Sequence, residues 1–229
     1  VHRFFIPVLP NEEDVTLIEP RLLQLLVRVL RCRVGDLFVL FGEHTDDALV
    51  RVMAISKRDV AVRRERVLPA IVPPVRRLVA AVSITKRDTF ELVTQKLTEL
   101  GVDTLVPLHT NHTVKQGIRA DRLEIIAREA TEQSGRNTLL SIAAPLSLEA
   151  CLKTFPLPAI VWDAHTVATT TALPKDDRVI MYVGPEGGWS DEERSLFAHC
   201  SAQFASLGPT ILRSETAAIV GAYELLRTT

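Results

Sequence analysis

Residues 183–193 read Val-Gly-Pro-Glu-Gly-Gly-Trp-Ser-Asp-Glu-Glu, and three of the ten glycines of the chain fall within five of these positions. The apolar run at 179–183 predicts a buried strand. Ser190 with Glu193 three residues later predicts a capping box at the start of a helix. A glycine-rich turn between a strand and a helix lets a ligand approach the backbone, because glycine has no Cβ. This stretch therefore predicts a ligand site at the carboxyl end of a strand in an α/β sheet.

A second loop of the same kind lies at 207–217, which reads Leu-Gly-Pro-Thr-Ile-Leu-Arg-Ser-Glu-Thr-Ala. Residues 204–207 predict a short strand, Gly208-Pro209 a turn, and Ser214-Glu215 a capped helix start with an acidic first turn. Neither loop matches the dinucleotide fingerprint G-x-G-x-x-G or the Gly-Lys-Ser/Thr end of a P-loop. We expect the two loops to lie side by side at the ends of neighbouring strands.

The composition is that of a soluble globular protein of 229 residues, 47% of them hydrophobic and 24% charged. No apolar run reaches the about 20 residues that a membrane-spanning helix needs, and no signal-peptide pattern opens the chain, so we expect a cytoplasmic protein. Its three cysteines are an odd number at wide spacing, which argues against disulfides and a cysteine-based zinc site. The net charge is −1, and the slight basic excess of the first 140 residues is too mild to indicate nucleic-acid binding by itself.

A proline-rich stretch at 69–76 predicts a linker, because Pro69, Pro73 and Pro74 cannot continue a helix or an interior strand. Over residues 1–68, short alternating segments predict a small antiparallel barrel or sandwich. Over residues 77–229, strand and helix patterns alternate, which predicts a parallel sheet covered on both faces. Expected strands lie at 2–6, 36–41, 48–55, 60–67, 78–84, 104–108, 159–163, 179–183 and 204–207. Expected helices lie at about 88–101, 121–135, 147–154, 190–200 and 215–227. The first two are expected to begin with acidic caps at Asp88 and Asp121 and to end at Gly101 and Gly135.

The loops at 183–188 and 207–212 resemble the signature loops of the SPOUT class of RNA methyltransferases, and most closely those of the RsmE family. Further similarity through 28–36, 95–102 and 128–136 extends the resemblance over nearly the whole chain. That family methylates N3 of a uridine in 16S rRNA, with S-adenosylmethionine as methyl donor. The resemblance implies a PUA-like, RNA-binding β-barrel followed by a SPOUT domain whose carboxyl-terminal segment forms a trefoil knot. It also implies a homodimer that acts on 16S rRNA of the 30S subunit.

In that family the cofactor lies between the two loops, and the strand end at 162–164 adds a third wall. Backbone groups of glycine-rich loops can read the adenine edge, while apolar side chains supply further contact. Carried over to this chain, the cofactor-binding residues are Trp162, Val183, Gly184, Glu186, Gly187, Leu207, Gly208, Ile211 and Leu212. Glu186 either holds the cofactor or binds loop amides and keeps the loops rigid; we favour the second interpretation, because buried carboxylates are usually hydrogen-bonded.

Methyl transfer to N3 requires alignment of the uridine with the methyl group and loss of the N3 proton. A positive group near O2 or O4 would stabilise the developing anion, and Arg213 and Arg136 are the candidates for this role. Glu215 is a candidate base, although a carboxylate in the first turn of a helix often only complements the helix dipole.

The chain departs from the family pattern at three places: Thr210 replaces an arginine, Ser214 a threonine, and Asn111-His112 an arginine-serine pair. The first and third changes each remove a potential phosphate contact, which affects the expected substrate affinity more than the expected reaction. His109 and His112 form an H-x-x-H pair, but two ligands fall short of the usual three or four, so we expect no metal.

A helix that begins at Pro20 is a candidate RNA-binding element. At 100° per residue, Arg21, Gln24, Arg28 and Arg31 fall within about 80° of one another, opposite an apolar side. An arginine stripe without acidic neighbours could bind phosphates, although most charge runs are only solvated surface.

The sequence therefore predicts an S-adenosylmethionine-dependent rRNA (uridine-N3) methyltransferase. Two other hypotheses remain open: a SPOUT methyltransferase for another RNA nucleotide, and a non-catalytic RNA-binding ribosome-assembly factor that retains the pocket as a relic. The last helix carries the residues Ala217, Ala218, Val220, Gly221 and Leu225, most of them small, which predict close packing at an interface between two copies of the chain.

Overall fold

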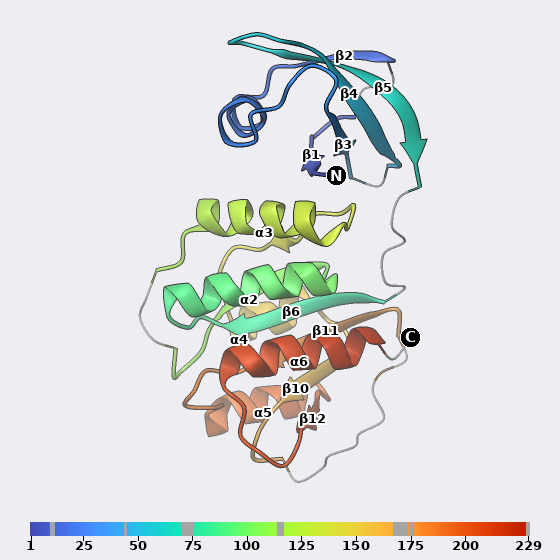
Figure 1. Cartoon of the computed structure of the whole chain (residues 1–229). Coiled ribbons are helices and arrows are strands. Elements are labelled where there is room, and N and C mark those ends of the chain that lie inside the picture. The colour runs from blue at the N-terminus through green and yellow to red at the C-terminus, as the bar shows by residue number, and fades with distance from the viewer. Residues whose placement is uncertain are drawn as a thin grey trace. The chain divides into compact units, whose positions relative to one another are not determined.

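The computed structural model contains two compact units (Figure 1). It describes residues 1–9, 12–43, 45–69, 76–113, 117–166, 174 and 176–227. The first unit consists of Val1–Pro73 with Thr131–Thr138, and the second of Pro74–Ala130 with Leu139–Thr229. Most of the predicted linker at 69–76 lies outside the described residues, and the expected domain limits remain a prediction.

The first unit is built on a five-stranded sheet in the order β1-β3-β4-β5-β2. Strands β1 and β3 pair in parallel, and the other neighbours pair antiparallel. Side chains alternate in direction along a strand, so Ala48, Val50 and Val52 of β4 enter one core together. The PUA-like barrel remains a prediction. The strands are β1 (Arg3–Phe5), β2 (Asp14–Leu17), β3 (Leu37–Phe41), β4 (Asp47–Ile55) and β5 (Val60–Leu68).

The helical segment of the first unit differs from the expected α-helix. Helix α1 (Pro20–Leu23) continues as a π-helix over Gln24–Val29. Because the hydrogen bonds of a π-helix join residues five positions apart, side chains are not spaced by 100° around it. Arg31 lies beyond its end, with a left-handed φ of 52°.

The arginines of this segment differ in their surroundings. The Arg21 guanidinium donates to both carboxylate oxygens of Glu132, at 2.8 and 3.0 Å, within the first unit. Arg28 and Arg31 are exposed. The expectation of an arginine face without acidic neighbours is wrong for Arg21, and Arg28 and Arg31 remain candidate phosphate contacts.

The second unit is built on a seven-stranded sheet in the order β12-β10-β11-β6-β7-β8, with β9 also paired to β7. All of these pairs are parallel, which confirms the predicted parallel sheet of an α/β fold. The strands are β6 (Arg77–Ser83), β7 (Thr104–His109), β8 (Ser141–Ile142), β9 (Leu146–Ser147), β10 (Ala159–Trp162), β11 (Arg178–Val183) and β12 (Gln203–Ala205).

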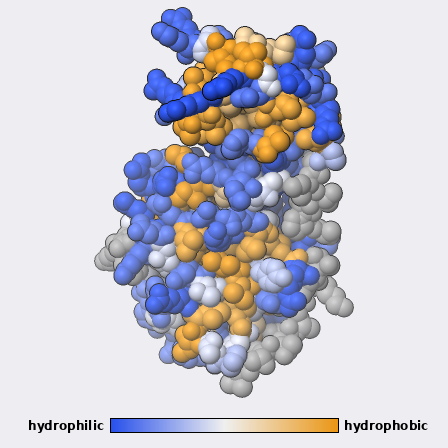
Figure 2. All heavy atoms as spheres, viewed as in Figure 1, coloured by the Kyte–Doolittle hydropathy of each residue, from blue (hydrophilic) through white to orange (hydrophobic). Residues whose placement is uncertain are grey.

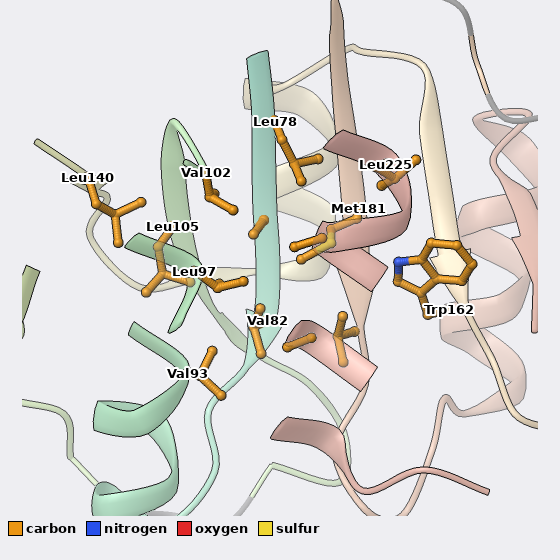
Figure 3. Packing of buried hydrophobic residues seen from close by; sticks show 14 of the residues in the cluster. Leu78, Val82, Val93, Leu97, Val102, Leu105, Leu140, Trp162, Met181 and Leu225 are labelled. Carbon is orange, nitrogen blue, oxygen red and sulfur yellow. The ribbon is translucent and has the colours of Figure 1, made fainter. Parts of the chain in front are cut away.

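Helices cover both faces of this sheet (Figure 1). Leu78 and Val82 of β6 pack on one face with residues of α2, α3 and α6, as the labelled side chains of Figure 3 illustrate for α2 and α6. Val79 and Ala81 pack on the other face with residues of α4 and α5. Strand β6 is thus buried on both sides, which explains its unbroken apolar sequence. The helices are α2 (Arg87–Leu100), α3 (Ala120–Ser134), α4 (Leu148–Thr154), α5 (Asp191–His199) and α6 (Ser214–Arg227).

Predicted helix ends are confirmed more often than predicted helix starts. The Ser190–Glu193 capping box opens α5, and Gly101 ends α2 with a left-handed φ of 91°. Asp88 and Asp121, however, lie in the first turns of α2 and α3 rather than at the cap positions. They complement the helix dipole, and their interpretation as caps is wrong.

Helix α6 packs tightly against the end of β10. A Cβ on Gly221 would lie only 2.3 Å from Nε1 of Trp162, so only glycine fits at this position. Ala218, Gly221 and Leu225 are buried inside the second unit. These three residues are therefore unavailable for the predicted interface between two copies of the chain, whereas Ala217 and Val220 are half-buried.

The strands that precede the two glycine-rich loops are not neighbours as predicted, because β10 lies between β11 and β12. The three strands are parallel, so their carboxyl ends nevertheless meet at one edge of the sheet. The connection from β10 to β11 includes residues 167–173, which lie outside the described residues. The trefoil knot remains a prediction.

Candidate functional site

A cavity lies at the carboxyl ends of β10, β11 and β12 in the second unit. Its walls come from the loops that follow these strands and from the first turn of α6. This edge is where open α/β sheets bind their ligands. The lining consists of residues 162–165, 183–189, 206–207, 210–212, 214 and 217.

The loop after β11 is shaped by its glycines. A Cβ on Gly184 would lie 3.1 Å from the buried indole of Trp189, and one on Gly187 would lie 3.0 Å from Cβ of His112. Gly188 has a left-handed φ of 70°, which favours glycine. These glycines therefore allow close packing and a tight turn at the wall of the cavity.

The loop after β12 is joined directly to the first loop. The Ser214 hydroxyl donates to the carbonyl oxygen of Gly184 at 2.8 Å. Ser214 is the first residue of α6 and serves this contact rather than the predicted helix cap. Gly208 has a φ of 143°, a conformation that side-chain-bearing residues rarely adopt. Two distant sequence segments thus form one wall.

Asp163 forms the third wall with a nearly buried carboxylate. Arg194 of α5 donates to its two oxygens at 2.6 and 3.2 Å, and the Thr166 hydroxyl donates at 3.2 Å. Burial acts to raise the pKa of Asp163, but the hydrogen bonds and charge of Arg194, helped by Thr166 and the amide of His165, hold that pKa below its ordinary value. The carboxylate is therefore ionised and fixed in place beside the cavity.

Replacing Arg194 with methionine is expected to lower the free energy of unfolding by about 2–3 kcal/mol at pH 7. Removing one partner of a fully buried pair typically costs about 3–5 kcal/mol, and the Arg194 side chain is 32% exposed, so water screens part of the effect. In the native protein, the Arg194–Asp163 pair stabilises the fold fully at pH values above the ordinary pKa of an aspartate. This stabilisation is lost as the pH falls through the lowered pKa of Asp163. Denaturant titrations at several pH values measure both effects.

In the Arg194→Met protein, burial still raises the pKa of Asp163 but Arg194 no longer lowers it, so the carboxylate takes up a proton at a higher pH. The stability difference between the two proteins should therefore shrink as pH is lowered from 7 to 4. A difference that does not change with pH would show that Arg194 stabilises the fold by packing alone.

All of the expected cofactor residues except Gly208 line the cavity. Gly208 instead gives the second loop its shape, through its φ of 143°. Glu186 lines the cavity but is exposed, and no hydrogen bond to its carboxylate is found in the described part of the chain. The interpretation of Glu186 as a buried carboxylate that binds loop amides is therefore wrong.

The three expected catalytic residues are not brought together in the cavity. Arg213 is exposed and lies between the lining residues Leu212 and Ser214. Glu215 is half-buried in the first turn of α6 and does not line the cavity. Arg136 belongs to the first unit, where its guanidinium donates to the Thr138 hydroxyl at 3.0 Å.

Several lining residues were not predicted from the sequence, among them Trp189, Ser206 and Ser214. Trp189 directly follows the expected cofactor loop at 183–188, Ser206 directly precedes the one at 207–212, and Ser214 lies two residues beyond it, so nearness in sequence was the available signal. His112 packs against Gly187 from a segment more than seventy residues away, so no local pattern could reveal that contact.

Within the described ranges, no group of three or more His, Cys, Asp or Glu residues could hold a metal ion. None of the helices described is both long and apolar enough to cross a membrane. Cys32, Cys151 and Cys200 are all free thiols; Cys151 is buried and Cys200 is exposed.

The fold and its glycine-walled cavity define a domain of the RNA methyltransferase class: a family model described as an RNA methyltransferase domain matches residues 73–225, well over half of the chain. The chain is also 32% identical over 199 residues to the ribosomal RNA small subunit methyltransferase E of Rickettsia conorii, an alignment that covers 83% of this chain and 80% of the relative. The chain therefore belongs to the ribosomal RNA small subunit methyltransferase E family.

Solved structures share the fold over nearly its whole length. A methyltransferase from Legionella pneumophila, solved with its cofactor S-adenosylmethionine, is 29% identical with a TM-score of 0.87, and the match covers 97% of this chain and 96% of that one. The ribosomal RNA small subunit methyltransferase E of Neisseria gonorrhoeae, also bound to S-adenosylmethionine, is 24% identical with a TM-score of 0.88 and supports the fold alone. That match covers 98% of this chain and 96% of the other.

Proposed function

We propose that this chain transfers the methyl group of S-adenosylmethionine to N3 of a uridine in 16S rRNA. The observation that carries this proposal is the single cavity formed by both glycine-rich loops at the carboxyl edge of the sheet. Membership of the ribosomal RNA small subunit methyltransferase E family supports the reaction and the RNA substrate. The choice of N3 rests on the sequence resemblance to that family.

The residues of the cavity fit this cofactor. Backbone N–H and C=O groups of the glycine-rich loops offer the donors and acceptors that an adenine edge needs, and Leu207, Ile211 and Leu212 offer apolar contact. Both carboxylate oxygens of Asp163 accept hydrogen bonds from Arg194, so the carboxylate is held in one position beside the cavity. The methyl donor, when bound, supplies an activated methyl group on a sulfonium that is a good leaving group.

The protein must then position the uridine and stabilise the charge left when N3 loses its proton. Arg213 is exposed beside the lining of the second loop, which supports it as the candidate that would donate to O2 or O4 of the base. Arg136, a residue of the first unit, stays the second candidate that the sequence offers for this role. Glu215, two residues beyond Arg213, is the candidate that would accept the proton.

Methylation of 16S rRNA tests the proposal. Mass mapping of modified nucleotides should show one N3-methyluridine missing from a strain without this protein, and purified protein should restore it to undermethylated 30S particles. A missing methyl group on another nucleotide would indicate a different RNA methyltransferase. Calorimetry that detects no binding of S-adenosylmethionine would instead favour a non-catalytic assembly factor.

The same family resemblance supports the finer expectations: a PUA-like barrel in the first unit, a carboxyl-terminal trefoil knot, a cytoplasmic location and a homodimer.

On the viewed face of the second unit, apolar residues gather along the region that α2 and α6 occupy (Figure 2). Leu92 of α2 and Tyr223 of α6 are 40% and 53% exposed. We propose this surface, rather than the buried small residues of α6, as the contact between the two copies.

Changing Arg28 and Arg31 to glutamate is expected to weaken RNA binding and to reduce its salt dependence, because fewer counterions are released when the complex forms. Filter binding to 16S rRNA over a series of salt concentrations measures the slope. Cofactor affinity should not change. Arg21→Gln is the informative comparison, because Arg21 is already paired with Glu132 and should affect the slope less. An unaltered slope in the double variant would mean that Arg28 and Arg31 are ordinary solvated surface.

A further inference from the structure

The segment Thr110–Thr113, which follows β7, lies against the glycine-rich loop of the cavity. Nδ1 of His112 is 3.2 Å from the carbonyl oxygen of Gly188. The His112 side chain also occupies the space beside Gly187 that a Cβ would need. Gly187 and Gly188 both line the cavity, whereas His112 does not, so this exposed histidine contacts the loop without lining the cavity.

Asn111 makes a second set of contacts to the same loop. Its backbone N–H donates to Oε1 of Glu193 at 2.9 Å, and its side-chain amide donates to the Ser190 hydroxyl at 2.8 Å. Glu193 is only 4% exposed, and its other oxygen accepts the Ser190 N–H at 2.8 Å. One buried carboxylate therefore joins the segment after β7 to the start of α5, where the glycine-rich loop ends.

The segment is itself anchored to the sheet. The hydroxyls of Ser83, Thr110 and Thr113 lie within 2.7–3.0 Å of one another. Ser83 is fully buried at the carboxyl end of β6, which pairs with β7 and β11. The segment that carries His112 is thus tied to the sheet by the hydroxyl cluster and to the start of α5 by Asn111.

We propose that Asn111 and His112 are positioning residues that hold the glycine-rich loop in its cofactor-binding shape. The role in cofactor binding rests on the proposed function. A carbonyl oxygen only accepts hydrogen bonds, so Nδ1 of His112 must carry the proton in this contact. Asparagine places an N–H donor close to the position of Nδ1, whereas alanine places none there. The two substitutions therefore separate the hydrogen bond from the rest of the side chain.

The test is the affinity for S-adenosylmethionine, and for its demethylated product, measured by calorimetry. Loss of one hydrogen bond of about 1–1.4 kcal/mol predicts that His112→Ala raises both dissociation constants about fivefold to tenfold. His112→Asn should restore both to within about twofold of the native values. His109→Ala is the matched control, because His109 is an exposed histidine of the same motif that does not line the cavity.

Hydrogen exchange of the Gly188 amide in the cofactor-free protein is the second readout. This amide donates to the Pro185 carbonyl at 2.9 Å, so it reports the shape of the loop without any ligand. Faster exchange in His112→Ala, with recovery in His112→Asn, is expected. Unchanged exchange together with unchanged affinity in His112→Ala would overturn the proposal, as would an asparagine variant no better than alanine. If the native protein binds no S-adenosylmethionine, the proposed function fails, while the exchange result still decides the positioning role.

Discussion

Replacement of Gly208 by valine is expected to weaken S-adenosylmethionine binding strongly and leave both units folded. Gly208 has a φ of 143°, where a β-branched residue is strained by about 1–3 kcal/mol. No atom lies within 4 Å of the position of its Cβ, so the strain comes from the backbone and not from a clash. The loop should relieve that strain by moving Leu207, Ile211 and Leu212, which line the cavity. Calorimetry should show an affinity about 5-fold to 150-fold weaker, the factor that this strain corresponds to when the loop must return to its native shape to bind.

Gly35→Val is the matched control for this prediction. Gly35 also has a positive φ, of 97°, and no atom within 4 Å of its Cβ position, but it belongs to the first unit. It should carry a similar backbone strain and leave cofactor affinity unchanged. Native affinity in the Gly208→Val protein would mean that the second loop does not shape the cofactor site.

The alternation of strands and helices in the second unit could be predicted because each element carries a complete local pattern. Strand β6 is an unbroken apolar run, and α5 begins with a full capping box. The order of the strands could not be predicted in this way. Nothing local records that β10 lies between β11 and β12, because strand order depends on contacts between distant segments. The π-helix at 24–29 was missed because its apolar pattern also fits an α-helix.

The cofactor site was predictable to the extent that backbone and apolar residues define it, since glycines and their neighbours are contiguous in sequence. Long-range side-chain contacts were not predictable. Gly187 and Gly208 carry the same sequence signal, yet Gly187 makes room for His112 whereas Gly208 adopts a restricted φ. Arg21 likewise belongs to an arginine-rich pattern, but its partner Glu132 lies more than one hundred residues away. Such pairs appear only once the chain is folded.

Arg213→Ala is expected to lower the single-turnover rate of methyl transfer by about 10²–10³, a typical effect of losing one electrostatic donor. Arg213 is exposed and lies between two lining residues of the second loop, and the proposed role requires its guanidinium to donate to a base bound at the cavity. Cofactor affinity should change far less, because the uridine anion exists only as the reaction proceeds. Arg213→Lys should recover part of the rate, since an ammonium cannot reproduce the two-pronged donation of a guanidinium.

Rapid-quench measurements with saturating cofactor and undermethylated 30S particles give this rate, and calorimetry gives the affinity. Arg178→Ala is the matched control, because Arg178 is exposed at the amino end of β11, the opposite end of that strand from the cavity. It should leave both values unchanged. If Arg213→Ala keeps the rate within about twofold while cofactor affinity collapses, Arg213 is a binding residue and Arg136 becomes the candidate for stabilising the anion. A lost rate with retained affinity assigns that role to Arg213, because only an interaction made in the transition state separates the two quantities in this way.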